Sequence, residues 1–169
     1  MALTTIPSGM IAPAQTLSLN GVTFPATQVP SADANTLDDY EEGTFTPTLS
    51  FAGGGSVTYS EQSGTYTRVG RIVTCNASFF IGTTSSPSGN AEIAGLPFTV
   101  RAGEGFVAGI SVGLSRNFNS AFVINGYAAQ NQTRIILSKN TSAQDFLAVA
   151  GADLKSGTGL YVTVTYQAV

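Results

Sequence analysis

The sequence has no histidine, no tryptophan and only one cysteine, Cys75. Without histidine, the chain cannot form a Ser-His-Asp or Cys-His nucleophile system, or a histidine-ligated zinc site. A single cysteine excludes a disulfide within the chain and any cysteine-ligated metal cluster. We therefore predict that the protein is not an enzyme, has no catalytic and no metal-binding residues, and needs no cofactor.

Charged residues are also scarce, at 10% of the chain against about 25% in typical soluble domains. The first 67 residues contain six acidic residues and no lysine or arginine, whereas the seven basic residues lie scattered from Arg68 onward. A chain without a basic run is poorly suited to nucleic acid or to an anionic membrane, so we expect neither as a partner. The N-terminal residues lack the features of a signal peptide, and no run approaches about 18 apolar residues, so we expect synthesis and folding in a cytosol.

The first 43 residues differ in composition from the rest of the chain. Four of the seven prolines lie here, and each disfavours helix at and just before its own position. The segment is nevertheless too apolar for a solvated linker. We predict an extended N-terminal arm, residues 1–43 with an acidic hinge, which docks on a partner chain through Leu3, Ile6, Met10, Ile11, Leu17 and Leu19. The alternative is an arm that wraps its own domain.

From residue 44 onward, apolar and polar residues alternate as they do in strands with one buried face. Turn residues, among them those at 62–64 and in the loop 82–90, separate short runs of this kind. The pattern predicts strands at residues 44–51, 57–60, 65–69, 72–81, 91–94, 105–113, 121–128, 133–138 and 160–167. Residues 142–149 could form a helical turn. We therefore predict an all-β fold, an antiparallel jelly-roll-like β-sandwich over residues 44–169 that also serves as a trimerisation module.

Several of these strands carry apolar residues on both faces. Ile72 is next to Val73, Phe79 is next to Phe80, and residues 122–124 are all bulky. A sandwich core takes only one face of each sheet, so the other face needs a neighbour. We expect a homo-oligomer, with a ligand pocket as the less common explanation. Cys75 shares the core-facing positions of its strand, so we expect a buried thiol there.

Residues 38–42 hold four carboxylates in five positions. Such a cluster could bind calcium, but its spacing differs from that of a D-x-D-x-D-G loop, and the later glutamate is missing. Two explanations are more common: a solvated turn, or carboxylates that pair with arginines of the same or a neighbouring subunit. We predict a subunit interface at Asp38, Asp39, Arg68, Arg71, Ile72 and Phe80. Glycoside hydrolysis would need two carboxylates across a cleft, and no pattern pairs any two of Glu61, Glu92, Glu104, Asp145 and Asp153.

Residues 36–49, TLDDYEEGTFTPTL, resemble the LDDYEEGTWTPTL signature of tailed-bacteriophage virion proteins, chiefly tail-fibre-like ones. Phe45 stands where that family often has tryptophan. The similarity covers about residues 20–169 and continues through Tyr59 and residues 64–70, 89–90, 94–98, 151–154 and 163–166. The resemblance implies a homotrimeric β-sandwich module on the virion surface, made in the cytoplasm of the bacterial host.

The place on the particle must be inferred from what the chain lacks. A long tail fibre needs a shaft, and this chain has neither heptads nor a repeat of about 20–50 residues. We therefore expect a capsid decoration or cement protein whose arm grips the major capsid protein or a tail or neck protein. The alternative is a short tail fibre or tail-tip protein that binds a host-surface receptor or glycan. The receptor contacts are unknown. Tryptophan, a typical residue of glycan sites, is absent, but tyrosines and amides leave glycan binding open, namely Tyr40, Tyr59, Tyr66, Tyr127, Asn117, Asn119 and Asn125.

Overall fold

The structure is a computed structural model that describes residues 33, 37, 39–103, 108–141 and 144–169. Asp38 and the six predicted docking residues of the arm, Leu3, Ile6, Met10, Ile11, Leu17 and Leu19, lie outside the described residues. The described part is all-β, as predicted, apart from one 3₁₀ turn at Gly151–Asp153. Its strands are β1 (Tyr40–Phe45), β2 (Thr48–Phe51), β3 (Ser56–Val69), β4 (Ile72–Ser85), β5 (Ala91–Ala94), β6 (Ala108–Arg116), β7 (Val123–Ala128), β8 (Arg134–Thr141), β9 (Gln144–Ala148) and β10 (Gly159–Gln167).

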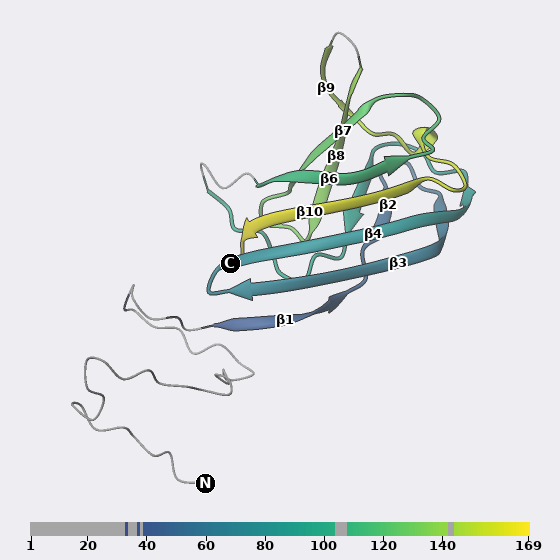
Figure 1. The fold of residues 1–169 in the computed structure, drawn as a ribbon. Helices are drawn as coiled ribbons and strands as arrows, with labels where there is room; N and C mark the ends of the chain where they lie inside the picture. Colours follow the sequence, from purple (N-terminus) through teal and green to yellow (C-terminus); the bar gives the residue numbers. More distant parts are fainter. Residues whose placement is uncertain (1–32, 34–36, 38, 104–107, 142–143) are drawn as a thin grey trace, which may run out of the picture.

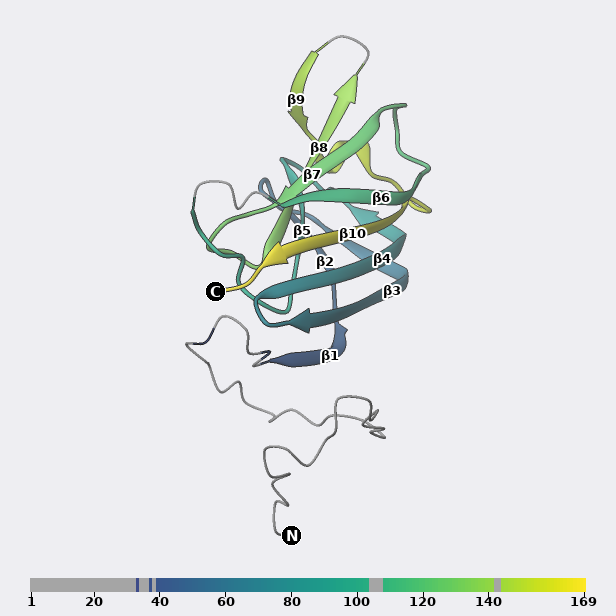
Figure 2. The same cartoon turned by 60° about the vertical axis from the view of Figure 1, so that its left-hand side comes forward.

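The strands form one curled antiparallel sheet in the order β1-β3-β4-β10-β6-β7-β8-β5-β2. The first layer contains β1, β3, β4, β10 and β6, which lie side by side in Figure 1, and the second contains β7, β8, β5 and β2. The two layers join at β6, because its residues 110–116 pair with β10 whereas its residues 108–109 pair with β7. β9 pairs with β8 as a hairpin that projects beyond the two layers (Figure 2). The antiparallel sandwich-like arrangement agrees with the sequence, and the jelly-roll connectivity stays a prediction.

The chain also crosses between the layers at Pro47. β1 and β2 are consecutive in sequence but occupy the two ends of the strand order. Proline has no N–H to donate to a ladder, so a strand readily ends there. Two hydrogen bonds connect the crossing to β3: Gln62 Nε2 donates to the Pro47 carbonyl at 2.7 Å, and the Leu49 N–H donates to the Tyr59 hydroxyl at 2.6 Å. The predicted boundary at residues 43/44 falls inside β1, so the sheet already begins within the acidic segment.

The core lies between the two layers and follows the predicted alternation. On β4, the side chains of Val73, Cys75, Ala77, Phe79 and Ile81 are all buried, as predicted from their shared face. The neighbouring strand β10 adds Leu160, Val162 and Val164 on the same side, and the second layer supplies facing side chains that include Ile93, Ile135 and Leu137. Burial raises the pKa of the Cys75 thiol to about 11, which keeps the thiol protonated and unreactive.

Three local predictions were wrong. The predicted turn at residues 62–64 lies inside the continuous strand β3, because these residues pair with residues 77–79 of β4. Gly64 allows the close approach of Phe45, since a Cβ at Gly64 would lie 2.8 Å from the Phe45 ring. The predicted loop 82–90 is strand as far as Ser85, because β4 stays paired with the start of β3. The predicted helical turn at 142–149 contains β9, since pairing with β8 overrides a weak local helix preference.

Candidate functional site

The outer face of the first layer carries a row of polar side chains that crosses five strands. Every second residue of a strand points away from the core, and the strand register brings five of these residues into line. Thr44 of β1 is paired with Thr65 of β3, Thr65 with Asn76 of β4, Asn76 with Thr163 of β10, and Thr163 with Ser111 of β6. This row combines hydroxyl groups and an amide from segments far apart in the sequence.

Two adjoining depressions follow this row, with volumes of about 410 and 440 Å³. Thr65 and Asn76 line both, so we name the two together the polar furrow. Gly113 helps to form it. The register between β10 and β6 shifts at Tyr161 and Val162, and a Cβ on Gly113 would meet only the Tyr161 carbonyl oxygen, at 4.0 Å. The furrow is therefore open at Gly113 because no side chain fills it.

Hydrogen bonds between neighbouring strands orient the side chains in the furrow. The Thr163 hydroxyl donates to Asn76 Oδ1 at 2.7 Å. This bond uses the carbonyl oxygen of the Asn76 amide, and no other described residue takes up its NH₂ group, which remains available as a donor. Next to this pair, the hydroxyls of Thr74 and Thr165 lie 3.0 Å apart. The furrow thus presents donors and acceptors in fixed positions.

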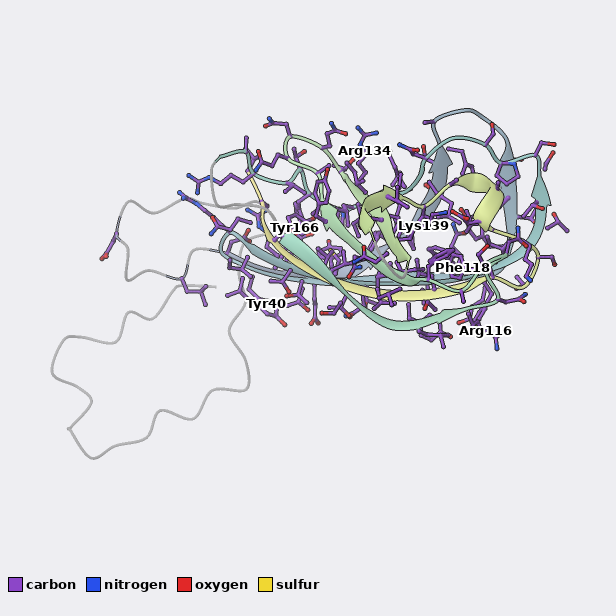
Figure 3. The ribbon with its side chains drawn as sticks, turned by 90° about the horizontal axis from the view of Figure 1, so that it is seen from above. Tyr40, Arg116, Phe118, Arg134, Lys139 and Tyr166 are labelled. Carbon is purple, nitrogen blue, oxygen red and sulfur yellow. The ribbon has the colours of Figure 1, made fainter. Side chains whose placement is uncertain are left out.

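An aromatic cluster lies at one end of the furrow. Tyr161, which lines the furrow, is 37% exposed, and its ring packs edge-on against Phe80 with centroids 5.6 Å apart. The Arg116 guanidinium lies over the Phe80 ring, 4.4 Å from its centroid. These contacts hold the Tyr161 ring in place at the surface. Figure 3 shows Arg116 at one end of the molecule and Tyr40 at the opposite end.

Two of the predicted interface residues pair within one chain. The Asp39 Oδ2 atom lies 3.0 Å from Arg68 Nε, and both side chains are about nine-tenths buried or more. The Arg68 Nε–H group donates to the Gly70 carbonyl at 2.8 Å, so charge rather than a hydrogen bond from Nε draws Asp39 Oδ2 to this atom. Arg68 also lies over the Phe98 ring at 4.7 Å. The structure thus shows Asp39 paired with an arginine of the same subunit.

The other predicted interface residues are at the surface of the same layer. Arg71 and Ile72 are exposed at the β3–β4 turn, and Phe80 is half-buried. Ile72 and Phe80 are on the outer face of β4, roughly 26 Å apart along the strand at about 3.3 Å per residue. The five of these residues that the structure describes, Asp39, Arg68, Arg71, Ile72 and Phe80, therefore form no single cluster.

The acidic segment is tied to tyrosines. The Tyr66 hydroxyl donates to Glu41, and this hydrogen bond, followed by burial, raises the pKa of Tyr66 to about 12. The Tyr40 hydroxyl donates to Glu42 Oε2 at 3.0 Å, which raises the pKa of Tyr40. Within the described residues, no three histidine, cysteine, aspartate or glutamate side chains gather as a set of metal ligands.

The carboxylates considered for glycoside hydrolysis are separated by their partners. Glu92 pairs with Arg134 at 2.6 Å, and Asp153 pairs with Lys139. Glu61 lines the furrow, whereas the side chains of Glu104 and Asp145 are not described. In the described residues, no helix is long and apolar enough to cross a membrane.

Most of the predicted glycan-binding candidates have structural contacts instead. Asn117 donates to the Ser156 carbonyl at 2.9 Å and Asn119 to the Ala152 carbonyl at 2.6 Å, so both amides hold loops together. The Tyr59 hydroxyl accepts a hydrogen bond from the Leu49 N–H near the Pro47 crossing, and the Tyr66 hydroxyl donates to Glu41. Sequence reasoning missed the furrow residues Tyr161, Asn76, Thr163 and Gly113. Alternation could have placed the first three on an outer face, but their pairing depends on the register of distant strands.

Comparison with known proteins finds a likeness among solved structures. No family model matches the chain, and no curated protein matches it. Among solved structures, the fold is similar to the crystal structure of the Dettilon tailspike protein, with a TM-score of 0.65 and 20% sequence identity. The likeness covers 76% of this chain and 24% of that chain, so it concerns the fold of one part of a longer protein.

Proposed function

We propose that this chain is a non-enzymatic structural module on the virion surface of a tailed bacteriophage, and that it belongs to a tail appendage of the fibre or spike type. The observation that carries this proposal is the likeness in fold to part of a tailspike protein, over 76% of this chain. The resemblance of residues 36–49 to the signature of tail-fibre-like proteins supports it independently. A tail location is preferred here to capsid decoration, because both likenesses are to tail proteins.

We also propose that the module acts as a homotrimer. Tyr40, Val69 and Ile72 are adjacent across β1, β3 and β4 by register, and they are 42%, 44% and 44% exposed. We name these three residues the apolar end patch. A contiguous patch of large apolar side chains on a polar face supports contact with another protein surface. Residues 1–43 would then anchor the trimer to a tail, neck or major capsid protein, as the composition of the arm predicts.

Antibody labelling of intact virions, followed by electron microscopy, tests the location. We expect label on the tail and a copy number far below that of the major capsid protein. Label spread over the capsid, with a copy number close to that of the major capsid protein, would show that the protein is a capsid decoration protein instead.

Light scattering on the purified chain tests the oligomeric state. We expect three times the monomer mass for the unmodified protein and a lower mass for Val69→Glu and Ile72→Glu, because a charge in the apolar end patch would be buried on assembly. Val123→Glu is the matched control, since Val123 is 65% exposed but belongs to β7 in the second layer. A monomeric unmodified protein would contradict the trimer.

A further inference from the structure

We propose that the polar furrow binds an uncharged oligosaccharide. This inference rests on the furrow itself and holds wherever the module sits on a particle. The two depressions, of about 410 and 440 Å³, each fall in the range of small-molecule sites, about 300–1,000 Å³. Because they adjoin at Thr65 and Asn76, they suit a chain of sugar units better than a single one.

The groups that line the furrow match the hydrogen-bonding needs of a sugar. Ser63, Thr65 and Ser78 offer hydroxyls, each of which can donate one hydrogen bond and accept two. The Asn76 amide is oriented by Thr163, so its NH₂ group donates in a fixed direction. Sugar hydroxyls also both donate and accept, and a row of such partners can bind several of them at once.

Tyr161 supplies the apolar contact that such a site needs. One face of a pyranose ring carries mainly C–H groups, and these pack well on an aromatic ring. The Tyr161 ring is 37% exposed and is held by its edge-on contact with Phe80. A tyrosine ring that is already fixed loses little side-chain entropy when a ligand binds.

The charge of the furrow selects between classes of polysaccharide. Glu61 lines one depression and Glu42 the other, whereas the residues that line them include no lysine or arginine. Acidic sugars would meet carboxylates without a compensating cation, which disfavours them. Uncharged sugars can instead use the same carboxylates as strong hydrogen-bond acceptors.

Saturation-transfer NMR on the full-length chain tests the proposal. The uncharged probes are maltotriose, tri-N-acetylchitotriose, mannotriose and raffinose, and the acidic probes are trigalacturonate and a hyaluronan tetrasaccharide, all at millimolar concentration. We expect transfer to at least one uncharged probe and to neither acidic probe. Equal transfer to the acidic probes, or none to any uncharged probe, would overturn the proposal.

Five variants locate the site. Gly113→Val should fill the furrow and raise the dissociation constant by about fivefold or more, the ratio that corresponds to ~1 kcal/mol. Gly109→Val is its control, because Gly109 is in the same strand with open space around it and does not line the furrow. Tyr161→Ala should weaken binding while Tyr161→Phe retains it, and Leu147→Ala is the control because it removes a similarly exposed apolar side chain from β9, outside the furrow.

Folding and assembly are measured on the same samples. Each variant should keep the melting temperature and the mass of the unmodified protein, because neither Gly113 nor Tyr161 belongs to the buried core. If Gly113→Val changes the mass and no probe binds, the furrow is a contact between copies and the proposal is wrong. These results do not depend on virion labelling, so the sugar site and the tail location can fail separately.

Discussion

Replacing Asp39 by alanine tests whether the buried ion pair with Arg68 holds the start of the sheet in place. The two side chains are 7% and 10% exposed, and the charged atoms lie 3.0 Å apart. At that distance, with an effective dielectric constant of about 20, the attraction is about 5.5 kcal/mol before the cost of desolvation. Removing one partner of a buried pair typically costs about 3–5 kcal/mol, because the other charge stays buried.

Arg68 retains its contacts with Gly70 and Phe98 in the Asp39→Ala variant, and they reduce this loss. Its Nε proton still reaches the Gly70 carbonyl at 2.8 Å, and its guanidinium still lies over Phe98, a contact worth about 1 kcal/mol. We therefore expect Asp39→Ala to lower the free energy of unfolding by about 2–4 kcal/mol. For a domain of this size, the melting temperature should fall by roughly 5–15 °C.

Urea unfolding followed by circular dichroism measures this loss, and an unchanged m-value would show that the two-state transition is preserved. The control is Arg71→Ala, which removes an exposed arginine from the adjoining β3–β4 turn and should stay within about 0.5 kcal/mol of the unmodified protein. The double variant Asp39→Ala/Arg68→Met should lose less than the sum of the two single losses. A loss for Asp39→Ala no larger than that for Arg71→Ala would refute the reasoning.

Three further predictions follow from single contacts. Gly95→Ala should be less stable than Gly54→Ala by at least ~1 kcal/mol in urea unfolding. Both glycines have a positive φ, +93° at Gly95 and +86° at Gly54. They differ because a Cβ at Gly95 would lie 2.7 Å from the Thr46 carbonyl oxygen, whereas a Cβ at Gly54 would meet no atom within 4 Å. Native Cys75 should react with a thiol reagent at pH 8 only as fast as the protein unfolds, and fast labelling would contradict its burial. The raised pKa of Tyr66 means that the folded state holds the phenol proton more tightly than the unfolded state, so its contribution to stability should persist below about pH 10 and decline between about pH 10 and 12. Tyr66→Phe should lessen this alkaline decline in urea unfolding, and an identical pH profile would argue against the bond to Glu41.

Much of the fold could be predicted because alternation is a local property. The period-two pattern identified the strands around residues 72–81 and 160–167 and placed Val73, Cys75 and Phe79 on one buried face. The errors in the predicted strands arose where the conformation of a residue depends on a neighbour that is distant in sequence. Gly64 resembles a turn glycine in the sequence, but in the fold it makes room for the Phe45 ring of the adjoining strand.

The features of the surface were less predictable than the core. The sequence left open whether the acidic segment is a solvated turn or pairs with Arg68 and Arg71 of the same or a neighbouring subunit, and the structure pairs Asp39 with Arg68 of the same chain. The furrow was missed, because Asn76 and Thr163 are remote in sequence and become neighbours only through the register of β4 and β10. The seven candidates chosen by residue type included Asn117 and Asn119, whose amides are occupied by backbone carbonyls.

The sequence by itself determined the fold class: its short runs of alternating apolar and polar residues predict an all-β module. Only the tertiary structure decided which surfaces that module presents. Pro47 ends the pairing of β1, and the chain crosses to the far end of the strand order, so one continuous segment supplies both edges of the curled sheet. Hydrophobic burial specifies which face of a strand turns inward, whereas the alignment of outward residues across five strands depends on register, which is set by the whole sheet at once.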